Sequence, residues 1–122
     1  LLQTTQLVQW ASVRVDHCYD AYGLVMAHEN GWKLVFSGDT RPCPELLRQG
    51  QGCTLLIHEA TFEDALCHHA VRKRHCTVSE AQAASQAMGA YRTIFTHFSQ
   101  RYPGTPAGIS VDGDLRGRPA VA

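Results

Sequence analysis

The stretch KLVFSGDTRPCPE, residues 33–45, decides how this chain folds. Residues 34–36 form a short apolar run that is typical of a buried strand, and Gly38 allows a sharp turn directly after it. Asp39 then places a carboxylate at the end of that strand, where an unpaired charge close to a core is costly. Asp39 is therefore expected to face a partner that makes its negative charge favourable.

The sequence on both sides of this stretch predicts an α/β chain. Strands are predicted where apolar or alternating runs are bounded by turn residues, at 12–15, 22–27, 32–36, 54–57 and 93–96. The turn Glu29-Asn30-Gly31 predicts a hairpin between the second and third of these strands. Helices are predicted from helical spacing and from a capping box at 77–80, covering 44–48, 62–74 and 77–88. Because strands and helices alternate in the later part, the later strands are expected to be parallel.

Composition limits the classes of protein to which the chain can belong. Its 122 residues, 44% hydrophobic and 18% charged, describe one small globular domain or part of a larger one. The formal net charge is zero, so an RNA partner would need a local basic patch or a further segment. Five cysteines without a C-x-x-C pair argue against a disulfide framework and a cysteine zinc site, and favour an intracellular location. No apolar run reaches the roughly 20 residues of a membrane span, so no membrane association is expected.

Polar side chains follow the predicted strands at the points where these strands end. They are His17, Asp39, the pair His58-Glu59, and His97. Since open α/β sheets bind ligands at the carboxyl ends of their strands, these groups are expected to converge on one edge. Histidine and aspartate without paired cysteines suit a catalytic zinc or another borderline metal, and a carboxylate can bridge two metal ions.

Each of these residues also has a simpler explanation. A histidine at a strand end often serves only as a hydrogen-bonding group, and Asp39 could form a local turn or cap a helix. Glu59 could be a solvated loop carboxylate. His75 could belong to the basic run 72–75, which is typical of a solvated helix end. The residues alone leave both interpretations open.

Four motifs favour the chemical interpretation. They are FSGDTRP at 36–42, LLIHEATFED at 55–64, HCT at 75–77 followed by Glu80-Ala81, and THFSQRY at 96–102. In order and spacing they resemble the C-terminal half of tRNase Z, a family of zinc-dependent tRNA 3′-processing endoribonucleases in the metallo-β-lactamase superfamily. The resemblance covers roughly residues 13–103 and is greatest to the long eukaryotic form. It implies an α/β fold, a metallo-β-lactamase-like αββα sandwich, of which residues 1–103 are the C-terminal half and 104–122 a Gly/Pro-rich tail.

The resemblance also implies a role for five side chains. His17, Asp39 and His97 match zinc ligands, and Asp39 matches the carboxylate that bridges two zinc ions. Glu59 and His75 match a pair that assists proton transfer to the leaving oxygen. Two zinc ions roughly 3.5–4 Å apart would stabilise charge on the attacking and leaving oxygens of a phosphodiester. The implied substrate is precursor tRNA, from which the 3′ trailer is removed.

The chain departs from the family pattern in one important way. The family's H-x-H-x-D-H motif supplies most of the remaining zinc ligands, and no H-x-H occurs in these 122 residues. The isolated chain is therefore expected to be weak or inactive, and to need the missing N-terminal half or a homologous subunit. A long eukaryotic form would act in the nucleus, the mitochondrion or both.

The sequence also allows two other functions. The chain could be a truncated, non-catalytic fragment that at most binds a partner or RNA, as its zero net charge and missing ligands allow. It could also be another metallo-β-lactamase-fold hydrolase, acting on cyclic nucleotides, lactones or sulfate esters.

Overall fold

The computed structural model describes residues 2–100, 104, 106 and 109. The tail predicted at 104–122 therefore lies almost entirely outside the described residues. The helices and strands follow one another in the order α1 (Leu2–Thr5), β1 (Leu7–Arg14), β2 (Tyr22–His28), β3 (Lys33–Phe36), α2 (Pro44–Gln49), β4 (Leu55–Glu59), the 3-10 turn η1 (Asp64–Leu66), α3 (Cys67–Lys73), α4 (Val78–Met88) and β5 (Arg92–Thr96). Among these described helices, none has the length and apolar character that crossing a membrane requires.

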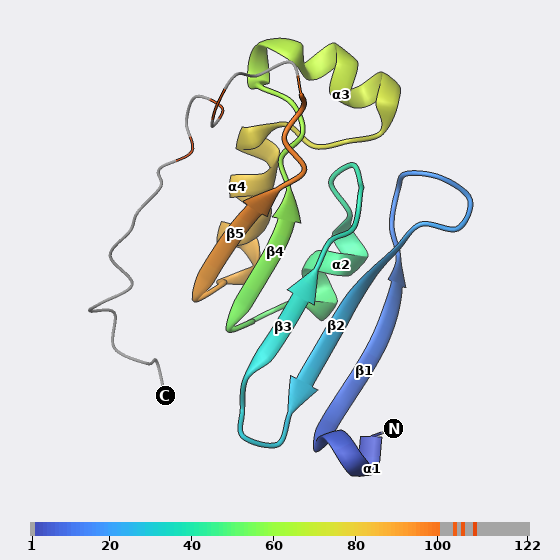
Figure 1. Ribbon diagram of the computed structural model, residues 1–122, viewed down its shortest axis with the longest axis vertical. Coiled ribbons are helices and arrows are strands. Elements are labelled where there is room, and N and C mark those ends of the chain that lie inside the picture. The colour runs from blue at the N-terminus through green and yellow to red at the C-terminus, as the bar shows by residue number, and fades with distance from the viewer. Residues whose placement is uncertain (1, 101–103, 105, 107–108, 110–122) are drawn as a thin grey trace.

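The five strands form one mixed sheet in the order β1-β2-β3-β4-β5. The β1–β2 and β2–β3 pairs are antiparallel, whereas β3–β4 and β4–β5 are parallel, which confirms the predicted parallel pairing of the later strands. Consequently β1, β3, β4 and β5 all run in the same direction, and only β2 runs in the opposite one (Figure 1). The carboxyl ends of four strands thus meet at one edge of the sheet.

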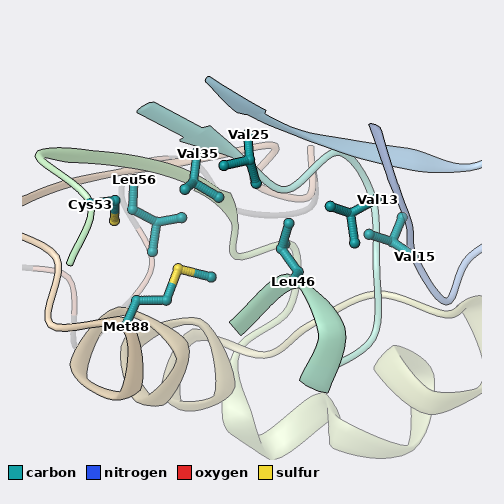
Figure 2. Packing of buried hydrophobic residues seen from close by; sticks show 8 residues of the cluster. All are labelled: Val13, Val15, Val25, Val35, Leu46, Cys53, Leu56 and Met88. Atoms are coloured by element: carbon teal, nitrogen blue, oxygen red, sulfur yellow. The ribbon is translucent and has the colours of Figure 1, made fainter. Parts of the chain in front are cut away.

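Helices α2 and α4 pack on one face of this sheet and enclose the main core. The strands contribute a row of cross-strand neighbours to it, Ala11, Val25, Val35 and Leu56. Leu46 of α2 and Met88 of α4 point toward this row (Figure 2). Leu46 and Met88 are 1% and 0% exposed, so the two helices are held to the sheet by burial of apolar side chains.

The opposite face of the sheet, called here the open face, is also apolar. Two rows of paired residues form it: Trp10, Met26, Leu34 and Leu55, and then Leu24, Phe36, Ile57 and Ile94. Trp10 is 47% exposed, Phe36 43% and Ile94 50%. An apolar face of this extent needs a second layer against it, as expected for half of a sandwich.

The helix predicted at 62–74 is wrong at its start, whereas the helix predicted at 77–88 is confirmed. Phe62 is 3% exposed and forms a parallel bridge with Thr77 instead of beginning a helix at 62. Its backbone N–H and C=O bind Cys76 and Val78, so they cannot enter a helical ladder, and α3 begins only at Cys67. In α4, Thr77 and Glu80 form the predicted capping box, and Gly89 ends the helix in a left-handed conformation.

Candidate metal centre

The loops that follow β1, β3 and β5 bring His17, Asp39 and His97 together. The Asp39 Oδ2 atom lies 3.9 Å from His17 Nε2 and 3.5 Å from His97 Nε2. Gly38 permits this turn, because its φ is +60° and an added Cβ would lie 2.9 Å from the carbonyl oxygen of Tyr22. The three side chains stay between 24% and 50% exposed, so a ligand can reach them.

His75, on the loop between α3 and α4, completes the cluster. Ligand atoms of His17, Asp39 and His75 all lie within 4.8 Å of one another. The His75 ring centroid is 4.7 Å from that of His17 and 5.3 Å from that of His97. The structure therefore places His75 among the side chains that the sequence predicts as ligands, and not only beside Glu59.

The hydrogen bonds of His17 and His75 fix which ring nitrogen faces the cluster. His17 Nδ1 lies 2.8 Å from the carbonyl oxygen of Arg74, and since a carbonyl only accepts, Nδ1 must carry the proton. His75 Nδ1 donates in the same way to Glu59 Oε1 at 2.8 Å. Both rings keep Nε2 for a ligand, which is the arrangement that metal-binding histidines require. Arg74 offers its carbonyl from a left-handed conformation, with φ of 57°.

Glu59 is buried, with 2% of its surface exposed, so it is not the solvated loop carboxylate that the sequence left open. Its two oxygens accept hydrogen bonds from five donors. These are Thr40 N (2.7 Å) and His75 Nδ1 (2.8 Å) on Oε1, and Thr61 Oγ1 (2.7 Å), Cys76 N (3.0 Å) and Thr61 N (3.3 Å) on Oε2. Glu59 thereby joins the loops that follow β3 and β4 to the loop that carries His75.

The donor set of the cluster fits zinc. Imidazole nitrogens and one carboxylate suit a borderline divalent ion, and the carbonyl and carboxylate on the two Nδ1 atoms hold the rings in a ligating orientation. Cys76 is adjacent to His75 but does not compete, because burial raises the pKa of its thiol and keeps it protonated. Within the part of the chain that the structure describes, His17, Asp39 and His75 form the group of side chains that lie close enough together to hold a metal ion, and His97 lies next to Asp39.

His58 precedes Glu59 and gives the fold a pH dependence. Its side chain is 2% exposed and Nδ1 donates to the Glu59 carbonyl at 2.7 Å, while burial lowers its pKa below the ordinary 6.5. The unfolded chain therefore binds a proton here at a pH at which the folded chain does not. We expect the free energy of unfolding to fall as the pH drops below about 6.5, toward the lowered pKa, with at most about 1.4 kcal/mol per pH unit from this one proton.

The measurement is urea unfolding between pH 5 and 7.5 with a chelator present. His58→Asn keeps a donor near the position of Nδ1 and should show a shallower pH dependence than the unsubstituted chain. His68→Asn, at an exposed position of α3, is the matched control and should keep the original slope. Equal slopes for all three proteins would contradict a role for His58.

Comparisons with known proteins identify relatives of this chain. A family model described as the beta-lactamase superfamily domain matches residues 2–98. The chain is 51% identical to tRNAse Z TRZ4, mitochondrial, of Arabidopsis thaliana, over 78% of this chain and 11% of that protein. It is 47% identical to zinc phosphodiesterase ELAC protein 2 of Homo sapiens, over 87% of this chain and 13% of that protein.

A solved structure matches the fold as well as the sequence. The crystal structure of a long form RNase Z from yeast superposes with a TM-score of 0.81 and 37% sequence identity. The match covers 93% of this chain and 16% of the yeast protein. The chain thus corresponds to only a small part of each of these longer proteins.

Proposed function

This chain belongs to the beta-lactamase superfamily, and its relatives at 47–51% identity are named tRNase Z and zinc phosphodiesterase. From this premise we propose that the chain supplies part of the active site of a zinc-dependent endoribonuclease. The substrate we propose is precursor tRNA, cut to remove the 3′ trailer. The observation that carries the proposal is the convergence of His17, Asp39 and His97 on one sheet edge, beside the His75–Glu59 pair.

In this proposal His17, Asp39 and His97 hold zinc, with Asp39 between the two histidines. Zinc, when bound, supplies a Lewis acid that stabilises negative charge on phosphoryl oxygens. Asp39 contributes the anionic oxygens that balance the charge of the metal. The Arg74 carbonyl keeps the proton of His17 on Nδ1, so that Nε2 stays available.

His75 is the proton donor to the leaving oxygen in this proposal. Glu59 accepts from Nδ1 and neutralises the charge of a protonated ring, so that Nε2–H remains to donate. The hydrogen bond to Glu59 occupies Nδ1 and leaves Nε2 to face a substrate. Cleavage leaves a 3′-hydroxyl on the tRNA and a 5′-phosphate on the trailer.

The chain is proposed to be one half of a catalytic domain. Residues 1–103 would pack their open face on a second sheet, supplied by an N-terminal half that also carries the H-x-H-x-D-H ligands. Since the net charge of the chain is zero, that half would also bring most of the attraction for RNA. Two Arabidopsis relatives are named mitochondrial, and we propose the mitochondrion as a site of action.

A hybrid protein tests this function. It is the human relative, zinc phosphodiesterase ELAC protein 2, in which this chain replaces the segment that it matches at 47% identity. We expect the zinc-loaded hybrid to release the 3′ trailer from precursor tRNA, and the isolated chain to show little or no cleavage. His97→Ala in the hybrid should abolish the activity.

Two other results would contradict the proposal. A folded, zinc-loaded hybrid that hydrolyses a small phosphodiester but leaves precursor tRNA intact would indicate a different hydrolase of the same fold. A folded hybrid without either activity would indicate a non-catalytic fragment. Circular dichroism and zinc stoichiometry by elemental mass spectrometry establish that the hybrid is folded and loaded before the assays are compared.

A further inference from the structure

Arg41 lies two residues after Asp39 and makes contacts that none of the predicted site roles uses. Its guanidinium binds Glu80 through two parallel bonds, Nη1 to Oε2 and Nη2 to Oε1, both 2.6 Å long. Nη1 also donates to the carbonyl oxygen of His75 at 2.6 Å. The Arg41 side chain is 17% exposed and that of Glu80 26%, so the pair is largely shielded from solvent.

The backbone around Arg41 holds the loop that carries His17. Arg41 N donates to the Asp16 carbonyl at 2.8 Å, and Asp16 N donates to Thr40 Oγ1 at 3.2 Å. Thr40 Oγ1 in turn donates to the Arg41 carbonyl at 2.6 Å. Thr40 and Arg41 therefore bind both the N–H and the C=O of Asp16, the residue before His17.

Arg41 also connects the cluster to the start of α4. Glu80 Oε2 accepts from Thr77 N at 2.9 Å within the capping box, so Glu80 is itself fixed by the helix. The segment from His75 to Thr77 is thereby held at its first residue by Arg41 and at its last by Glu80. The Arg41 side chain therefore joins the Asp39 loop to His75, as Glu59 also does.

We propose that Arg41 is a positioning residue of the metal centre, which holds His75 and the His17 loop in place around Asp39. This inference rests on the proposed metal centre. A lysine cannot replace Arg41, because an ammonium lacks the planar fork that reaches both Glu80 oxygens while it binds the His75 carbonyl. Losing an outer partner of this kind weakens metal binding about 10- to 100-fold.

Cobalt binding by the full 122-residue chain tests the proposal, with the visible absorption of Co²⁺ as the signal. Arg41→Lys should weaken Co²⁺ binding about 10- to 100-fold. Glu80→Gln should do the same, because glutamine still serves a capping box but removes the charge that Arg41 binds. The matched control is Arg48→Lys, since Arg48 makes a similar two-bond pair with Glu45 on the exposed surface of α2 and should leave Co²⁺ affinity unchanged.

A second measurement, made without a metal, reports the orientation of the His17 and His75 rings. Side-chain ¹⁵N NMR should show protonated Nδ1 and bare Nε2 on neutral His17 and His75 in the unsubstituted chain, and mixed tautomers in Arg41→Lys. Amide exchange at Cys76, whose N–H binds Glu59, should accelerate in that variant. Urea unfolding of Arg41→Lys and Arg48→Lys separates these local effects from a general loss of stability.

The possible outcomes separate the two proposals. Unchanged Co²⁺ affinity or unchanged tautomers in Arg41→Lys would overturn the positioning role and leave the metal centre standing. Absence of Co²⁺ binding by the unsubstituted chain, even at millimolar metal, would overturn the metal centre and this inference with it. Loss of trailer removal by the hybrid while Co²⁺ binding responds to Arg41 as expected would overturn the proposed reaction alone.

Discussion

Replacing Asp39 with asparagine is expected to lower zinc affinity by more than about 100-fold, the upper end of the loss when only an outer partner of a metal ligand is removed. Asp39 Oδ2 lies between His17 Nε2 and His97 Nε2, so its loss affects both predicted ligands at once. Asparagine keeps the shape of the side chain. It has no negative charge, however, and its amide group would point donor hydrogens at a cation.

The fold should tolerate this substitution. The Asp39 side chain is 39% exposed, and changes at such positions usually shift the free energy of unfolding by no more than about 0.5 kcal/mol. Zinc titration against a competing chelator measures the affinity of the chain, and urea unfolding confirms its stability. In the hybrid, the same substitution should reduce trailer removal below detection.

Asp20→Asn is the matched control for Asp39→Asn. Asp20 is an exposed carboxylate in the same loop as His17, so the control makes the same chemical change close to the cluster. It should bind zinc as the unsubstituted chain does. If both variants bound zinc equally well, Asp39 would not be a ligand, and its place at the end of β3 would serve only the turn.

The sequence predicts the convergence on one sheet edge because that convergence depends only on strand order and direction. Each predicted residue follows an apolar run, and β1, β3, β4 and β5 point the same way. The predicted metallo-β-lactamase-like fold is confirmed by the superposition on the yeast RNase Z and by the matching family model. The sequence also predicts the capping box, because this motif lies within four consecutive residues.

The contacts that hold the site could not be predicted from spacing. Apart from Thr61, which is two positions away, the donors to Glu59 come from residues 40, 75 and 76, and nothing local in the sequence pairs them with it. The error at Phe62 has the same cause, because helical spacing of apolar residues cannot show that this backbone pairs with the segment before α4. Thr40 and Arg41 lie in the stretch 33–45, but their contacts with Glu59 and Glu80 depend on how the loops fold and cannot be predicted from the sequence.

Glu59→Gln is expected to cost about 3–5 kcal/mol of unfolding free energy, as removing one partner of a buried charged pair does. Glu59 is 2% exposed and each of its oxygens faces N–H donors. Whichever way a glutamine amide turns, its NH₂ group meets at least two of them. If it replaces Oε1, Thr40 N–H and His75 Nδ1–H lose their acceptor. If the NH₂ group replaces Oε2, the N–H groups of Thr61 and Cys76 lose their acceptor.

Each orphaned buried donor costs about 1–3 kcal/mol, so two of them account for most of the expected loss. Since small domains are stable by about 5–15 kcal/mol, the midpoint of urea unfolding should fall clearly. Glu45→Gln is the control, because that carboxylate likewise accepts several hydrogen bonds, from Arg48 and Gln49, but lies on the exposed surface of α2. Its midpoint should not move. Equal midpoints for the two variants would mean that Glu59 does not hold the three loops together, and the orientation of His75 would then need another source.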